Sequence, residues 1–133
     1  MCIRDSIKTI NPDILVIEYN ALFGVNKSLT IKYDANFKRP DVGIYKCLYG
    51  ASLKALTELS DKKGYSLVAT NLNGNNAFFV KNSLLNEKVY KQDYTTCYKE
   101  NSFKEYVGEN SEINYPTKKE IEELLNNKNV IEV

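Results

Sequence analysis

The chain has 133 residues, 18 of them basic and 17 acidic, and this balance excludes an electrostatic case for nucleic acid or an anionic membrane as a partner. Histidine is absent, which excludes histidine-based catalytic triads, histidine metal ligands and a histidine general base. The three cysteines, Cys2, Cys47 and Cys97, fit no metal-binding spacing and no disulfide framework, so the sequence predicts one cytoplasmic domain without a metal site.

The first six residues, MCIRDS, resemble the in-frame translation of a transposase adapter that is used to prepare DNA sequencing libraries. We therefore expect residues 1–6 to be an adapter artefact and the remainder to be a carboxyl-terminal fragment of a longer protein. A genuine short amino terminus is the alternative. Ile7 and Ile10 are expected to end a helix, because Pro12 cannot continue one. No stretch has the ~18 consecutive apolar residues of a membrane span, and the start has no apolar segment of signal-peptide type.

Residues 14–20, ILVIEYN, form the most apolar stretch of the chain and end in three polar side chains. A continuous apolar run with β-branched residues predicts a strand buried on both faces, as in the middle of a parallel sheet. Open α/β sheets bind their ligands at the carboxyl ends of such strands. The first candidates for a functional site are therefore Glu18, Tyr19 and Asn20.

The next stretch alternates apolar and polar residues over 29–33, which predicts a short strand with one exposed face. Residues 34–48 contain Pro40 and Gly43 and show no periodicity. We expect this segment to be an ordered loop over the carboxyl end of the sheet, where functional loops usually lie.

Residues 49–63 carry leucines at three-residue spacing with lysine and glutamate between them, and Gly64 follows, so this segment is predicted to be a helix. Ser52 is expected to cap its start rather than act as a nucleophile. Residues 65–71, YSLVATN, then predict a second strand. Because a helix lies in the connection, this strand should run parallel to the first, with a right-handed crossover.

The dipeptide Asn73-Gly74 separates this strand from residues 77–81, AFFVK. Asn-Gly between two strand-like runs indicates a tight hairpin, so AFFVK should be antiparallel to YSLVATN. We expect the asparagines around the turn to shape it rather than to bind a ligand.

Residues 83–116 are polar with scattered aromatic side chains, and we expect them to pack along the domain surface, with weak helix near 87–91. Thr117 and Glu120 have the spacing of a capping box before an apolar face, which predicts a short helix over 117–127. The last residues, NVIEV, should add an edge strand or pack in an extended form.

The segments NPDILVIEYN, YGASLKAL and KKGYSLVATNLNGNNAFFVKN together resemble the end of the FkbM-like family of class I S-adenosylmethionine-dependent methyltransferases. The similarity covers residues 12–82. It implies an α/β fold, the carboxyl-terminal half of a Rossmann-like methyltransferase sheet, with the order parallel strand, helix, parallel strand, antiparallel hairpin strand. Residues 7–82 would be this partial domain, and residues 83–133 an irregular carboxyl-terminal extension.

In the family, a glycine-rich loop and an acid in the first half of the fold bind S-adenosylmethionine, and the resemblance places both before residue 7. The chain has no G-x-G pattern. The resemblance therefore implies an S-adenosylmethionine-dependent O-methyltransferase acting on a sugar or small metabolite as the parent, and a fragment that binds no cofactor and is inactive. Of the residues present, only Glu18 and Asn20 carry over from the family, as groups at the strand end near the cleft. We expect Glu18 to be the catalytic base and Asn20 to contact the substrate, and we expect the same of the neighbouring Tyr19 from its place at the strand end.

Two kinds of alternative stand beside this interpretation. Glu18 could instead accept backbone N–H bonds from a loop, and Asn20 could close a local turn. At the level of the whole chain, the alternative is a non-catalytic α/β module that binds a protein partner. In the full fold ILVIEYN would pair on one side with a strand of the missing half and on the other with AFFVK. As a fragment, the chain should therefore expose an apolar edge on ILVIEYN, and we expect marginal stability or aggregation.

Overall fold

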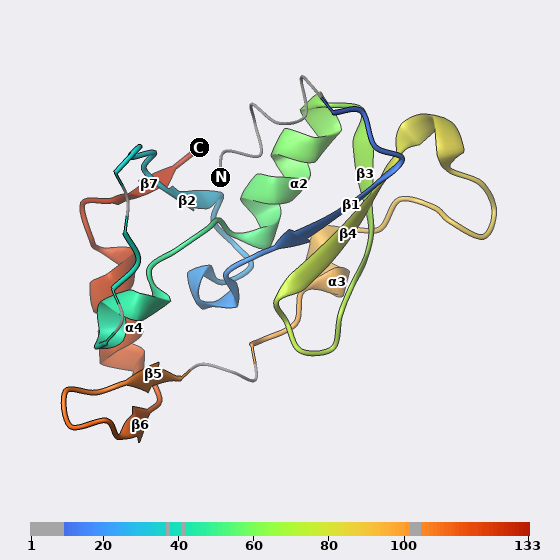
Figure 1. Cartoon of the computed structure of the whole chain (residues 1–133). Coiled ribbons are helices and arrows are strands. Elements are labelled where there is room, and N and C mark those ends of the chain that lie inside the picture. Colours follow the sequence, from blue (N-terminus) through green and yellow to red (C-terminus); the bar gives the residue numbers. More distant parts are fainter. Residues whose placement is uncertain (1–9, 37, 41, 102–104) are drawn as a thin grey trace.

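The structure is a computed structural model, and it describes residues 10–36, 38–40, 42–101 and 105–133 (Figure 1). The proposed adapter sequence and most of the predicted helix end at residues 7–10 lie outside the described residues. No helix in the described ranges is long and apolar enough to cross a membrane.

The main sheet has three strands in the order β1-β4-β3, with β4 (Asn76–Lys81) in the middle. β1 (Ile14–Glu18) and β3 (Tyr65–Thr70) each pair antiparallel with β4. They therefore run in the same direction, as predicted, but they are not neighbours. Every strand pair among the described residues is antiparallel. The fold is mixed α/β, and β4 lies between the two strands, so the expected pairing of ILVIEYN with AFFVK is present.

The hairpin between β3 and β4 is confirmed, with Gly74 at a φ of 72° in its turn. The turn is shaped by Asn71, whose side-chain oxygen accepts hydrogen bonds from the backbone of Asn75 and Asn76 at 3.2 and 3.0 Å. The prediction that these asparagines shape the turn is therefore confirmed for Asn71. A β-bulge between Leu67 and Ala69 shifts the register of the pair.

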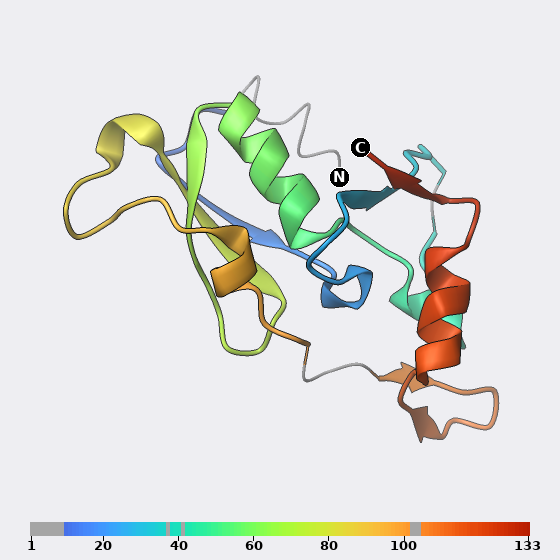
Figure 2. The same cartoon turned by 180° about the vertical axis from the view of Figure 1, so that it is seen from behind.

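The clearest predicted helix is α2 (Leu53–Lys62), which starts four residues later than the sequence suggested. Ser52 caps it, because its hydroxyl accepts a hydrogen bond from the amide of Ala55. α2 and the short helix α3 (Tyr94–Cys97) cover the same face of the sheet, the one seen in Figure 2. The core between them and the sheet contains Ile17, Tyr19, Ala21, Leu53, Leu56, Tyr65, Leu67, Ala77 and Phe79.

The opposite face of β1 is open, which corrects the prediction of a strand buried on both faces. Ile14 and Val16 are 60% and 59% exposed, whereas Ile17 on the helix side is 7% exposed. The sequence pattern could not show this, because an apolar run looks the same whether one or both faces are covered. β1 is also an edge strand, since no strand in the described part of the chain pairs with its other side.

A second apolar cluster is formed by the carboxyl-terminal residues with the loop that follows β1. Here β7 (Val130–Glu132) pairs antiparallel with β2 (Leu29–Ile31), so the predicted edge strand at the chain's end is confirmed. α4 (Lys118–Leu125) begins with the predicted capping box. The cluster's buried residues are Leu22, Phe23, Leu29, Cys47, Leu48 and Leu124.

The remaining elements are short and lie outside the main sheet. The predicted weak helix at 87–91 is not formed, and α3 follows it instead. A two-residue pair, β5 (Tyr106–Val107) with β6 (Ile113–Asn114), precedes α4 (Figure 1). Single 3₁₀ turns are found at Ala21–Phe23, Ile44–Cys47 and Asn82–Leu84.

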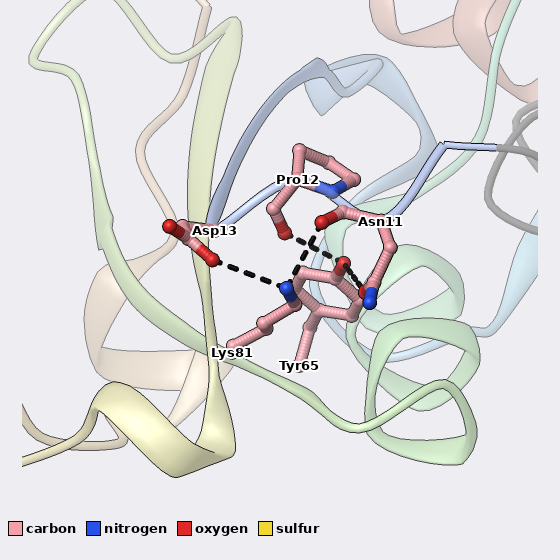
Figure 3. Close-up of polar contacts among 5 residues, drawn as sticks. All are labelled: Asn11, Pro12, Asp13, Tyr65 and Lys81. Carbon is pink, nitrogen blue, oxygen red and sulfur yellow. Dashed lines mark hydrogen bonds and ion pairs between the residues drawn. The ribbon is translucent and has the colours of Figure 1, made fainter.

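The start of β1 is fixed to both other strands of the main sheet (Figure 3). The Tyr65 hydroxyl donates to the carbonyl of Pro12 at 2.7 Å. Lys81 donates to the carbonyl of Asn11 at 2.9 Å and forms an ion pair with Asp13 at 3.1 Å. These contacts tie the loop before the strand to β3 and β4, at the end of β1 opposite Glu18.

Candidate functional site

Glu18 is exposed at the carboxyl end of β1. Glu18 lies opposite Asn76 in the register of the sheet, on the same open face as Val16. Within the described residues its carboxylate forms no hydrogen bond or ion pair, so the alternative role as an acceptor for a neighbouring loop is not seen there. A free carboxylate at this position can accept a proton or a hydrogen bond from a bound molecule.

Asn20 is 1% exposed, and its side chain holds the loop that returns to β1. Its amide nitrogen donates to the carbonyls of Cys47 and Tyr49 at 2.8 and 2.9 Å, and its oxygen accepts from the amide of Leu22 at 3.0 Å. The alternative prediction, in which Asn20 shapes a loop, agrees with these contacts. Contact with a substrate stays a prediction, and it would require one of these bonds to open.

Tyr19 is fully buried and its hydroxyl binds the segment after α3. The hydroxyl donates to the carbonyl of Lys99 at 3.0 Å and accepts from the amide of the same residue at 3.3 Å. Burial raises the pKa of Tyr19, although the hydrogen bond to Lys99 opposes this. The predicted substrate contact of Tyr19 is likewise untested, and in this arrangement its hydroxyl has two partners already.

The segment after α3 covers the carboxyl end of the sheet on the helix side. Tyr98 lies beside Tyr19, with ring centroids 6.3 Å apart, and its hydroxyl donates to the carbonyl of Ala21 at 2.7 Å. Burial, together with the charge of Glu100, raises the pKa of Tyr98 to about 12. This side is therefore closed by packed tyrosines, and Glu18 faces the other side of the sheet.

Arg39 and Tyr49, which were not among the predicted site residues, contact each other. The guanidinium carbon of Arg39 lies 4.1 Å from the centroid of the Tyr49 ring, and its Nε donates to the carbonyl of Lys46 at 2.7 Å. Burial raises the pKa of Tyr49, the charge of Arg39 lowers it, and the charge of Glu18 raises it. Tyr49 is thus within electrostatic reach of both charged groups.

The positions of these two residues in the sequence indicated only that they lie in or beside a candidate functional loop. Arg39 lies in the predicted loop over the carboxyl end of the sheet, and Tyr49 directly follows that loop. Nothing in the sequence showed that they stack, because the contact depends on how residues 34–48 fold back. The loop returns to β1 through Asn20, whose backbone amide also donates to the carbonyl of Ala51 at 2.8 Å.

A separate open hollow of about 430 Å³ lies at the end of β2 and has a mixed polar and apolar lining. None of the predicted site residues lines it. Its lining residues are Ile31, Lys32, Tyr33, Asp34, Ala35, Leu48 and Asn129.

Two observations bear on metal and cofactor binding by this chain. No group of three or more His, Cys, Asp or Glu residues among the described residues could hold a metal ion. The cofactor implied by the family resemblance needs a glycine-rich turn after a strand, and the chain has no G-x-G pattern. The residues present therefore do not fit this cofactor, and no chemical step is derived through it.

Comparison of the chain with protein-family models finds no matching family, and comparison with curated proteins and with solved structures finds no significant match. The function proposed below therefore rests on the sequence and on the geometry of the described residues.

Proposed function

We propose that the chain is the carboxyl-terminal part of an S-adenosylmethionine-dependent O-methyltransferase of the FkbM-like type, acting on a sugar or small metabolite. The observation that carries the proposal is the exposed position of Glu18 at the carboxyl end of β1. An acid in this place is suited to take the proton of a substrate hydroxyl, because its oxygens have no partner among the described residues.

The order and direction of the strands support the proposal. β1 is followed by α2, then by β3 in the same direction, then by β4 in the opposite direction. This is the order that the resemblance implies for the end of a Rossmann-like methyltransferase sheet. The pairing of ILVIEYN with AFFVK, which the resemblance also implies, is present as β1 with β4.

The open face and free edge of β1 also support a role as part of a larger sheet. Ile14 and Val16 expose apolar side chains on one face. The backbone groups on the outer edge of β1 have no strand partner among the described residues. A soluble protein rarely leaves such an edge uncovered, so we infer that preceding strands of the parent protein pair with β1.

Under this proposal, cofactor binding and substrate binding belong to different parts of the parent protein. The preceding part would bind S-adenosylmethionine, and the residues of this chain would bind and orient the substrate. Under this division the 133-residue chain is inactive alone. Glu18 would hold the substrate hydroxyl and accept its proton.

The test begins with recovery of the coding sequence upstream of Ser6 from the same DNA source. The full-length protein is then purified, its binding of S-adenosylmethionine is measured by calorimetry, and transfer of a labelled methyl group is measured on a panel of sugars. We expect binding and transfer, with Glu18→Gln at least about 100-fold slower in kcat than the unsubstituted protein. Glu87→Gln, a change at another exposed glutamate, is the matched control and should leave the rate unchanged.

A full-length protein that does not bind S-adenosylmethionine would contradict the proposal. If the upstream sequence starts with a native start codon at the junction, or encodes an unrelated domain, the non-catalytic interaction module becomes the better interpretation. A Glu18→Gln protein that keeps full kcat would leave the family in place but remove the catalytic role of this residue.

A further inference from the structure

The open hollow at the end of β2 brings two opposite charges and an aromatic ring around an apolar floor. The floor consists of the half-buried Ile31 and the buried Leu48, and the exposed Lys32, Tyr33 and Asp34 line the hollow with them. Its volume of about 430 Å³ lies within the range of pockets that bind small molecules. The hollow is therefore large enough for a ligand of its own, separate from the predicted site residues.

The backbone that carries these side chains is held in place by hydrogen bonds. β2 pairs with β7, and the amide of Lys32 donates at 2.7 Å to the carbonyl of Asn129, which also lines the hollow and directly precedes β7 (Figure 1). The Asp34 carboxylate accepts a hydrogen bond from the amide of Asn36 at 2.8 Å, which closes a local turn. The position of Asp34 in the loop is therefore fixed by its own side chain.

The charges of Lys32 and Asp34 favour a ligand that carries both signs. Within the described part of the chain the two side chains form no ion pair with each other, although both line the same hollow. A ligand with a single charge is attracted by one of them and repelled by the other. A ligand with one positive and one negative group is attracted by both, and each attraction is modest because water screens exposed charges.

The ring of Tyr33 and the apolar floor add two further preferences. Tyr33 is 72% exposed, so its ring is accessible to a ligand. An ammonium group binds to the face of a tyrosine ring, and the neighbouring carboxylate of Asp34 attracts the same group. The floor favours an apolar side chain, because contact with it removes apolar surface from water. An ammonium, a carboxylate and an apolar side chain are together the groups of a free α-amino acid such as leucine.

We propose that this hollow is a binding site for a zwitterionic α-amino acid with an apolar side chain. Its ammonium group lies at Asp34 and the Tyr33 ring, its carboxylate at Lys32, and its side chain against the apolar floor. The inference goes beyond the proposed function and does not depend on it, because it uses neither Glu18 nor a cofactor.

The test uses the 133-residue chain, labelled with ¹⁵N, and follows its amide signals by NMR as ligand is added. The probe is L-leucine, and three comparison ligands each lack one of its groups: 4-methylpentanoate the ammonium, 3-methylbutylamine the carboxylate, and glycine the apolar side chain. We expect leucine to shift the signals of residues 31–35, 48 and 129. Each comparison ligand should bind at least about three-fold more weakly than leucine.

Two variants assign the charged groups of the ligand to their partners. Asp34→Asn removes the charge but keeps a side-chain oxygen for the amide of Asn36, so the turn is retained. It should bind leucine about three-fold more weakly and lose the preference for leucine over 4-methylpentanoate. Lys32→Gln should weaken binding similarly and lose the preference over 3-methylbutylamine. Lys62→Gln, at an exposed position of α2, is the matched control and should bind leucine as the unsubstituted chain does.

The proposal is overturned if leucine shifts none of these signals, if glycine binds as tightly as leucine, or if Lys62→Gln weakens binding as much as Lys32→Gln. Tighter binding of glucose than of leucine would assign the hollow to a neutral sugar and would also overturn it. The experiment contains no S-adenosylmethionine, so its outcome is independent of the methyltransferase assay. Leucine binding without methyl transfer by the full-length protein would refute only the proposed function, and the converse result would refute only this inference.

Discussion

Gly74, in the turn between β3 and β4, lies directly against the backbone of Lys99. A Cβ added at Gly74 would be 2.6 Å from the Lys99 carbonyl oxygen, closer than any real contact, and it would meet the carbonyl of Glu100 as well. Gly74 also has a φ of 72°, which disfavours any side chain. The hairpin turn and the segment after α3 are therefore packed backbone to backbone, which closes the helix side of the sheet end.

Gly74→Ala is expected to destabilise the chain by about 3 kcal/mol, because the Cβ forces two backbone segments apart as well as straining φ. The free energy of unfolding in urea measures this. Gly64→Ala is the control, since Gly64 has a φ of 81° with nothing within 4 Å of its Cβ position, and it should cost only about 1 kcal/mol. Equal losses in both variants would show that the contact with Lys99 does not form.

Asn20→Ala should cost about 2 to 3 kcal/mol in unfolding free energy, because the buried Asn20 side chain donates to the carbonyls of Cys47 and Tyr49, and both lose this donor. Asn20→Asp should be at least as destabilising, since it places a charge beside two carbonyl oxygens. Asn26→Ala, at an exposed position, is the control and should change stability by less than about 0.5 kcal/mol. A loss of unfolding free energy well below this value in Asn20→Ala would show that water takes over the hydrogen bonds of the Asn20 side chain.

Stability should fall as the pH rises from 10 to 12 through ionisation of Tyr98, whose pKa is raised from 10.0 to about 12 in the folded chain. With a raised folded pKa, the stabilisation is fully present below the unfolded pKa and is lost as the pH approaches the folded one. The midpoint of urea unfolding, measured across this range, should fall more steeply for the unsubstituted chain than for Tyr98→Phe. Parallel slopes would contradict the raised pKa, and absorbance titration of tyrosinate checks it directly.

Thr117→Ala should lower the stability of the chain by about 1 kcal/mol, because the Thr117 hydroxyl caps α4 by accepting a hydrogen bond from the amide of Glu120 at 3.3 Å. Loss of the cap should fray the helix that supplies the buried Leu124. Urea unfolding measures the change, and Lys119→Ala, at an exposed position in the first turn of the same helix, should be neutral. Equal free energies of unfolding for Thr117→Ala and Lys119→Ala would contradict the capping box.

Val16→Lys should reduce self-association of the chain without loss of fold. Val16 is 59% exposed on the open face of an edge strand, where a lysine discourages pairing between sheets. Sedimentation velocity at several concentrations measures the effect. The neighbouring change Ile17→Lys buries a charge in the core and should unfold the chain instead. Unchanged association in Val16→Lys would show that another surface is responsible.

The sequence by itself predicted the elements whose signals are local. The Asn73-Gly74 hairpin, the Ser52 cap of α2 and the capping box of α4 depend on residues a few positions apart, and all three are present. The sequence also predicted that Glu18 ends a strand. Such features are set by backbone geometry and short hydrogen bonds, which neighbouring residues fix without help from the rest of the fold.

Only the tertiary structure decided the features that join distant residues. The apolar run 14–18 is compatible with one covered face or two, and the position of α2 and α3 leaves Ile14 and Val16 exposed. The pairing of β1 with β4 was expected only from the family resemblance, because strands more than 50 residues apart in the sequence leave no local signal of their pairing. The stacking of Arg39 on Tyr49 depends on a loop without periodicity, held by one buried asparagine. The periodicity of a sequence indicates which side chains are apolar. Which distant residues those side chains contact is determined by packing in the folded chain.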